Sequence, residues 1–501
     1  MTTRRLAAML AATALISVFA PQAATAKSAL DWHDCPAQAP DEQPRNPGQK
    51  CAEIKVPLDY RNPGGEQITV TISRLSTAKP QKRRGVLLLN PGGPALEGLD
   101  VPSQFASTLP ASVRDAYDLV GFDPRGVGHS TPQSCGLPDP NPLGLFPYPA
   151  ADGSTAGNVE FARTVAETCG SAASAKNLKF YTTANTARDL DGIRRALGER
   201  KISYWGQSYG TYLGTVYASL FTRNTDRVVL EGNVDPTKGW SGQIALWGQG
   251  MNDRFADAAK VAITRKAGFG STVPEVTKSY LALVDRLDRE PAPVPGTKAS
   301  VNGLIVRHLT YGLLMRNENL PVLVGLWRAA ADLADGRLTD ADAAVLKQAF
   351  AAHPGTPGVP VDNQSTMFAA LTCGDGPWSK DLDEYAAKTA ADRAAYPLTG
   401  GMPANVWPCA FWEDEPIEAP VTVTDHGPRN ILILQNRRDN ATPWEGALGL
   451  KDALGHRAGF VGVDNGGHYV YDVGSKCADR ATVTFLTTGR LPAGDLNCSD
   501  V

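Results

Sequence analysis

One serine of the sequence lies between two glycines in the pattern G-x-S-x-G, which reads Gly206-Gln207-Ser208-Tyr209-Gly210. A serine hydroxyl is a weak nucleophile and needs a neighbouring base. The motif follows a short apolar run and precedes an apolar helical segment, and in this strand–turn–helix context the glycines permit a tight turn that exposes the hydroxyl. We therefore predict that Ser208 is a catalytic nucleophile.

A base and an acid are expected later in the chain, because this kind of turn has its partners in the order serine, acid, histidine. His468 follows the last predicted strand in a glycine-rich loop and is the candidate general base. Asp439 is the one carboxylate in the loop after the preceding strand, where it would orient the imidazole. Asp464 is the alternative acid, although it lies close to His468 in sequence. His129 follows an earlier strand and is interpreted as loop structure.

Acyl transfer also needs two N–H donors for the oxyanion. Tyr209 follows the nucleophile and is expected to supply one of them. The other is expected from the loop 90–94, which reads Asn-Pro-Gly-Gly-Pro and follows the third predicted strand. Because Pro94 has no N–H, we predict Gly93 as the second donor. This chemistry needs no metal and no organic cofactor, so we expect neither.

Eight short β-like runs would position these residues. They cover residues 52–57, 67–75, 85–89, 117–122, 202–205, 227–230, 430–434 and 459–463. Several of them, such as 86–89 and 431–434, are continuously apolar, as strands buried on both faces are. Helical patterns at 186–197 and 209–221 alternate with the runs, which indicates a mostly parallel, doubly wound α/β sheet.

The segment between the sixth and seventh runs has a different character. Residues 237–420 are rich in alanine and leucine with proline-rich breaks, which indicates an inserted helical cap domain. We predict a signal peptide at 1–26, the α/β core in two parts at 27–236 and 421–501, and the cap at 237–420.

The first residues are typical of an export signal. Arg4 and Arg5 precede an apolar run at 6–20, and Ala24-Thr25-Ala26 forms a small-x-small cleavage site. A membrane anchor is the alternative, but the run is shorter than the roughly 20 residues that a membrane-spanning helix needs. We therefore expect cleavage after Ala26 and an extracellular monomer without a membrane anchor.

The eight cysteines agree with export, because disulfides persist in oxidising compartments. Eight cysteines allow 105 pairings, and buried free thiols are an alternative for some of them. We favour the pairing of sequence neighbours: Cys35–Cys51, Cys135–Cys169, Cys373–Cys409 and Cys477–Cys498. With 49 Lys and Arg against 52 Asp and Glu, the chain has no basic surplus for binding nucleic acid.

Together, these motifs resemble those of secreted tripeptidyl aminopeptidase-like α/β-hydrolases, in the prolyl aminopeptidase family of serine peptidases. The matching pieces span nearly the whole chain after the export signal. They are Val-Pro-Leu-Asp-Tyr at 56–60, Asn-Pro-Gly-Gly-Pro at 90–94, Gly-Phe-Asp-Pro-Arg-Gly at 121–126, Tyr-Trp-Gly-Gln-Ser-Tyr-Gly-Thr at 204–211, Asp439 with Thr442-Pro443, and Gly467-His468.

The resemblance implies an α/β-hydrolase fold and a serine hydrolase that acts on short peptides from their N-terminus, with a small amide or an ester as the alternative substrate. The chain departs from the family at Leu96 and Glu97, where small residues are usual, and these two add bulk and charge near the expected site. A substrate ammonium would call for a carboxylate. The candidates are Glu97, Glu231, Asp375 and the cluster Glu413-Asp414-Glu415, and none is preferred.

Overall fold

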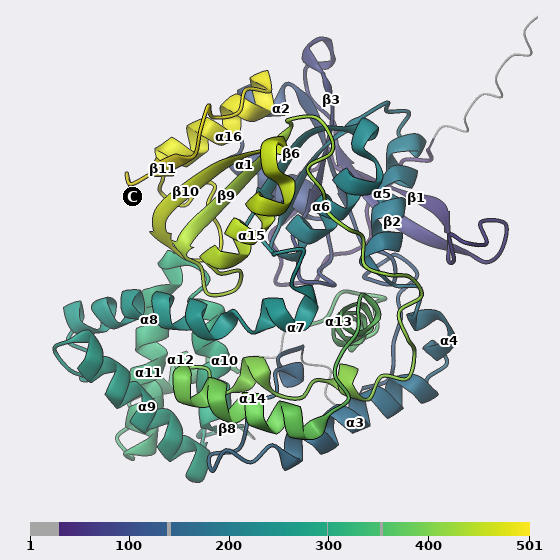
Figure 1. Cartoon of the computed structure of the whole chain (residues 1–501). Coiled ribbons are helices and arrows are strands. Elements are labelled where there is room, and N and C mark those ends of the chain that lie inside the picture. Colours follow the sequence, from purple (N-terminus) through teal and green to yellow (C-terminus); the bar gives the residue numbers. More distant parts are fainter. Residues whose placement is uncertain (1–29, 138–141, 298, 351–353) are drawn as a thin grey trace, which may run out of the picture.

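A computed structural model describes residues 30–137, 142–297, 299–350 and 354–501; the predicted signal peptide lies outside them. A nine-stranded sheet occupies the upper half of the molecule in Figure 1, in the spatial order β1-β2-β4-β3-β5-β6-β9-β10-β11. The strands are β1 (Lys50–Pro57), β2 (Gln67–Leu75), β3 (Gly85–Asn90), β4 (Tyr117–Phe122), β5 (Ile202–Gln207), β6 (Thr225–Glu231), β9 (Ile431–Arg438), β10 (Ala458–Gly466) and β11 (Leu496–Cys498).

The sheet is mostly parallel. Strand β2 pairs antiparallel with both β1 and β4, and every other pair of neighbouring strands in this sheet is parallel. Seven of the eight predicted runs lie wholly in strands of this sheet, and the eighth, 430–434, begins one residue before β9, so the fold class is confirmed. The predicted count of eight was wrong by one, because β11 has only three residues and no apolar run to mark it.

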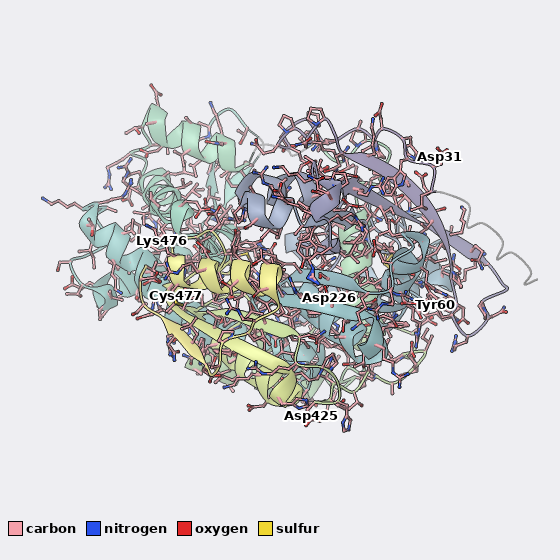
Figure 2. The ribbon with its side chains drawn as sticks, turned by 90° about the horizontal axis from the view of Figure 1, so that it is seen from above. Asp31, Tyr60, Asp226, Asp425, Lys476 and Cys477 are labelled. Atoms are coloured by element: carbon pink, nitrogen blue, oxygen red, sulfur yellow. A yellow bond between two sulfur atoms is a disulfide. The ribbon has the colours of Figure 1, made fainter. Side chains whose placement is uncertain are left out.

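Alternate residues of the central strands enter two separate cores. In β3, Val86 and Leu88 pack in one core, whereas Leu87 and Leu89 pack in the other. All four side chains are at most 2% exposed. The first core lies under α5 (Thr183–Ala196), α6 (Tyr209–Leu220) and α15 (Trp444–Leu454), and the second lies under α1 (Val101–Thr108) and α16 (Lys476–Thr488). Figure 2 shows α16 lying across one face of the sheet from its start at Lys476 and Cys477. Burial on both faces explains why these strands are continuously apolar.

Helices cover the sheet and build a second layer beneath it. They are α1 (Val101–Thr108), α2 (Ala111–Arg114), α3 (Ala156–Ser171), α4 (Ala175–Leu178), α5 (Thr183–Ala196), α6 (Tyr209–Leu220), α7 (Gly239–Ile244), α8 (Trp247–Thr264), α9 (Val273–Arg289), α10 (Gly303–Leu313), α11 (Leu320–Ala334), α12 (Asp340–Ala349), α13 (Asn363–Gly374), α14 (Leu382–Ala395), α15 (Trp444–Leu454) and α16 (Lys476–Thr488). Two short strands, β7 (Ala292–Pro293) and β8 (Ser300–Val301), form a hairpin in the second layer.

The helices from α7 to α14 lie between β6 and β9 in the chain and form most of the lower layer in Figure 1. They have a core of their own, in which the rings of Phe255, Tyr280 and Trp327 pack against one another. Helix α3 precedes this insertion in sequence, yet its Ala162 packs with Tyr385 of α14. We call all these helices the helical layer. The limits predicted for the domains stay a prediction.

All four predicted disulfides are confirmed: Cys35–Cys51, Cys135–Cys169, Cys373–Cys409 and Cys477–Cys498. Two of them, Cys135–Cys169 and Cys373–Cys409, join segments of the helical layer or its border. Within the part of the chain that the structure describes, no helix combines the length and the apolar character needed to span a bilayer.

Candidate active site

Ser208 stands on a sharp turn between β5 and α6. Its φ is 56° and its ψ −127°, which is a strained conformation for a residue with a side chain. The flanking glycines make this turn possible: a Cβ on Gly206 would lie 2.1 Å from the carbonyl oxygen of Gly210, and one on Gly210 would lie 2.6 Å from Asn90 Oδ1. The Ser208 residue is partly exposed, as a nucleophile must be.

Asp439 and His468 form a buried pair in the loops after β9 and β10. The imidazole Nδ1 donates to Asp439 Oδ2 at 2.9 Å and lies 3.1 Å from Oδ1. The carboxylate also accepts from the backbone N–H groups of Ala441 and Thr442 and from the Thr442 hydroxyl. Asp439 is 1% exposed and His468 3%. These contacts hold the proton on Nδ1 and leave Nε2 as the proton acceptor.

The imidazole lies at the same sheet edge as Ser208. Gln207 pairs with Glu231 across β5 and β6, so Ser208 and Gly232 are neighbours just beyond the two strand ends. A Cβ on Gly232 would lie 2.9 Å from His468 Cε1 and 3.1 Å from Nδ1. The glycine therefore lets the imidazole approach the backbone beside the nucleophile. The structure therefore places the three residues predicted as the triad at one edge of the sheet, and their catalytic roles stay a prediction.

The predicted oxyanion donors lie next to Ser208. A Cβ on Gly92 would lie 2.8 Å from Ser208 Cβ, so the loop after β3 packs against the nucleophile. The Gly92 N–H already donates to Asn90 Oδ1 at 3.1 Å, which leaves the next N–H in the loop, that of Gly93, as the donor. Tyr209 is the first residue of α6, and the N–H groups of a first helical turn have no partner within the helix. The assignment of Gly93 and Tyr209 stays a prediction.

The helical layer holds the histidine loop by contacts that sequence reasoning missed. The His468 N–H donates to the Met315 carbonyl at 2.8 Å. Arg254 of α8 is fully buried beneath this loop, and its guanidinium donates to the Leu314 carbonyl and to Asp257. A Cβ on Gly466 would lie 2.0 Å from Arg254 Nη1, so a side chain at this position would collide with the guanidinium. The glycine at position 466 is therefore the feature of the sequence that reflects this contact.

Asp257 joins this contact to the loop of the acid. Its Oδ2 accepts from both Arg254 at 2.7 Å and Arg438 at 2.9 Å, and Arg438 lies directly before Asp439. The two guanidinium groups outweigh the effect of burial and keep the pKa of Asp257 below its ordinary value. Asp464, the alternative acid, pairs with Arg438 at 2.8 Å and has a side chain that is 59% exposed. Because Asp464 is exposed and pairs with Arg438, the structure favours Asp439 as the acid of the site.

The carboxylates considered for binding a substrate amine have different surroundings. Glu97 lines a cavity of about 470 Å³ together with Pro91, Ala95 and Leu96 of the oxyanion loop, and burial raises its pKa. Glu231 is 1% exposed and engaged by four N–H groups. In the cluster at 413–415, Asp414 is part exposed and faces Lys179 across 3.9 Å.

Asp375 lies beside aromatic side chains. It accepts from the Thr183 N–H and hydroxyl and from the Trp240 indole, at 2.5 to 3.2 Å. Burial raises its pKa to about 6. The cavity beside it measures about 220 Å³ and includes Trp240, Trp378 and Tyr212 in its lining.

Two family models match the chain. The one described as "alpha/beta hydrolase fold" covers residues 85–272, which include Ser208, and the one described as "TAP-like protein" covers residues 398–498, which include Asp439 and His468. The fold and the site thus define an α/β-hydrolase.

Curated relatives match nearly the whole chain. The tripeptidyl aminopeptidase of Streptomyces lividans is 32% identical over 95% of this chain and 88% of its own length. The serine protease Hip1 of Mycobacterium tuberculosis is 28% identical over 94% of this chain and 91% of its own. Carboxylesterase B of the same organism is 30% identical over 90% and 86%. The chain belongs to the tripeptidyl aminopeptidase family of α/β-hydrolases, and it is a serine peptidase.

Proposed function

We propose that this protein is an exported aminopeptidase that releases short peptides or aminoacyl groups from the N-terminus of peptide substrates. The observation that supports the proposal is that Ser208, on its strained turn, and the buried Asp439–His468 pair lie at one edge of the sheet. The identity of the relatives supports a peptide substrate, and the four disulfides together with the export signal in the sequence support an extracellular location.

Each residue of the site has a role in this proposal. His468 Nε2 accepts the Ser208 proton as Oγ attacks the substrate carbonyl, and it then protonates the leaving amine. Asp439 holds the Nδ1 proton and stabilises the imidazolium. The N–H groups of Gly93 and Tyr209 bind the oxyanion. A water molecule, with His468 again as base, hydrolyses the acyl-enzyme and frees the N-terminal product.

The surroundings of the site favour small substrates with a free amine. The helical layer covers the sheet edge and would keep folded chains away from Ser208. The cavity beside the oxyanion loop carries acidic side chains, including Glu97 and Glu42. An ammonium group is attracted to such a cavity, whereas a blocked N-terminus gains nothing from it.

A carboxylesterase or amidase that uses the same triad is the second candidate. It is favoured by the 30% identity with a carboxylesterase and by Leu96, which adds apolar surface to the cavity beside the oxyanion loop. Ester hydrolysis needs the same nucleophile, base and oxyanion donors. The two candidates therefore differ in what occupies the cavity and not in the triad.

The experiment is hydrolysis of a substrate panel by residues 27–501 and by the Ser208→Ala variant. The panel contains tripeptidyl, dipeptidyl and aminoacyl anilides with free amines, their N-blocked counterparts, and short acyl esters. We expect cleavage of the free-amine anilides that is lost on blocking and lost in the variant. Cleavage of esters alone, indifferent to blocking, would replace the peptidase by an esterase with the same triad.

A further inference from the structure

Glu231 is a buried carboxylate that holds four N–H donors at the end of β6. Its Oε2 accepts from Trp205 Nε1 and Gln207 Nε2, both at 2.9 Å. Its Oε1 accepts from the backbone N–H groups of Val470 at 2.6 Å and Tyr471 at 2.8 Å. The residue is 1% exposed. The mechanism described above gives this group no role.

These four donors come from the two segments that carry the nucleophile and the base. Gln207 directly precedes Ser208, and Val470 lies two residues after His468. The main chain of Glu231 adds a third link, because its carbonyl accepts the Ser208 N–H at 2.9 Å. One residue therefore contacts the turn of the nucleophile through its backbone and its side chain, and it contacts the histidine loop as well.

We propose that Glu231 is a positioning residue, whose carboxylate sets the placement of His468 relative to Ser208 by joining the nucleophile turn to the histidine loop. The proposal rests on the catalytic roles proposed for these two residues. Proton transfer from Ser208 requires the imidazole within hydrogen-bond reach. A misplacement of about 1 Å can cost on the order of 100-fold in rate.

The number and kind of the donors explain why a carboxylate is needed. A backbone N–H and an indole N–H can only donate, so Trp205, Val470 and Tyr471 all require an acceptor. An ionised carboxylate offers acceptor positions on both oxygens. A glutamine of the same shape has one oxygen and one NH₂ group, and the NH₂ group would face at least one of these donors. Glu231→Gln therefore keeps the volume and breaks the link on one side.

The test compares Glu231→Gln with the unaltered protein in three measurements. They are kcat and KM on the best free-amine substrate, the second-order rate of labelling by a fluorophosphonate, and the fraction of sites that can be labelled. We expect kcat and the labelling rate, each per labelled site, to fall by about tenfold or more, with KM within about twofold. A misplaced base slows attack by Ser208 on both reagents but leaves the substrate cavity intact.

Asp189→Asn is the matched control for the loss of a buried acid. Asp189 and its partner Arg125 have side chains that are each 1% exposed, and Asp189 also accepts from Tyr60. These contacts lie outside the two linked segments. We expect this variant to lower the melting temperature while its kcat per labelled site stays within about twofold, since surviving folded molecules keep the site.

A second variant covers the case in which Glu231→Gln fails to fold. Gln207→Leu removes one of the four donors at a partly exposed position, and it should slow labelling in the same direction by a smaller factor. A kcat per site within twofold of the unaltered protein in folded Glu231→Gln, or an unchanged labelling rate in Gln207→Leu, would overturn the proposal. Absence of labelling in the unaltered protein would instead refute the proposed function, so the two failures are distinguishable.

Discussion

The sheet edge and the helical layer meet at the candidate active site, and they are held together in different ways. Backbone pairing and alternating apolar side chains define the sheet, and the loops after β5, β9 and β10 carry Ser208, Asp439 and His468. The helical layer comes from two separate stretches of chain, which side-chain packing joins. The disulfides Cys135–Cys169 and Cys373–Cys409 each form a link within one stretch or at its border. The candidate catalytic side chains thus belong to the sheet edge, whereas access to them depends on the helical layer.

The histidine loop belongs to the sheet edge, but residues of the helical layer hold it in place. The Met315 carbonyl and the Arg254–Asp257 pair belong to the helical layer, yet they contact the loop of His468 and the residue before Asp439. A change in the layer can therefore alter the geometry of the base. The following predictions separate the contribution of each region.

The largest effect is expected from the acid at the sheet edge. Asp439→Asn removes the charge that stabilises the imidazolium and favours the wrong tautomer, so kcat/KM should fall by about 10³- to 10⁴-fold. Asp464→Asn breaks an exposed ion pair and should change kcat/KM by less than about twofold. Steady-state kinetics on one free-amine anilide checks both. Equal losses in the two variants would mean that the acid has been assigned wrongly.

A smaller effect is expected from the guanidinium beneath the histidine loop. Arg254→Met removes the donor to the Leu314 carbonyl, Asp257 and Asn317 and should cost about 3 kcal/mol of stability, together with about tenfold in kcat. Arg307→Met breaks the Arg307–Asp288 pair inside the same layer and should lower stability alone. Urea unfolding and kcat per labelled site check the pair of variants. An unchanged kcat in folded Arg254→Met would show that the layer does not position the base.

The disulfides allow a comparison at nearly equal cost in stability. Cys373→Ser/Cys409→Ser opens a link in the helical layer, and Cys477→Ser/Cys498→Ser opens the link between α16 and β11. In the chain-entropy account each removal costs about 3 to 4 kcal/mol. We expect the first pair to raise KM for free-amine substrates and the second to leave KM unchanged. A larger KM change in the second pair would place substrate binding nearer to the sheet.

The smallest effect concerns pH. Burial raises the pKa of Asp375 to about 6 from an ordinary value near 4, so the folded protein binds this proton more tightly than the unfolded chain does. The contribution of this group to stability is therefore fully present below about pH 4 and falls as the pH rises to about 6. Asp375→Asn lacks the titration, so its stability relative to the unaltered protein should improve from pH 4 to pH 6. If the urea midpoints of the two proteins instead changed in parallel from pH 4 to pH 6, the raised pKa of Asp375 would be contradicted.

The sheet and its three catalytic candidates were predictable because local sequence determines them. Runs such as 86–89 must be strands buried on both faces, and the two glycines around Ser208 permit few structures other than a sharp turn. Strand β11 was not predicted, because three residues are too few to show a hydrophobic pattern. The roles of Arg254 and Glu231 could not be predicted, because their partners are backbone groups brought close only by the folded chain. Glu231 was one of several acids considered for a substrate amine, and its four donors place it in the framework of the site.

The most direct test is labelling with a fluorophosphonate, followed by peptide mapping by mass spectrometry. We expect one label per chain, on the peptide that carries Ser208. We also expect labelling to be lost in Ser208→Ala and strongly slowed in His468→Ala, while both variants remain folded. A label on another residue, or labelling at an undiminished rate in His468→Ala, would contradict the claim that these residues form one catalytic site.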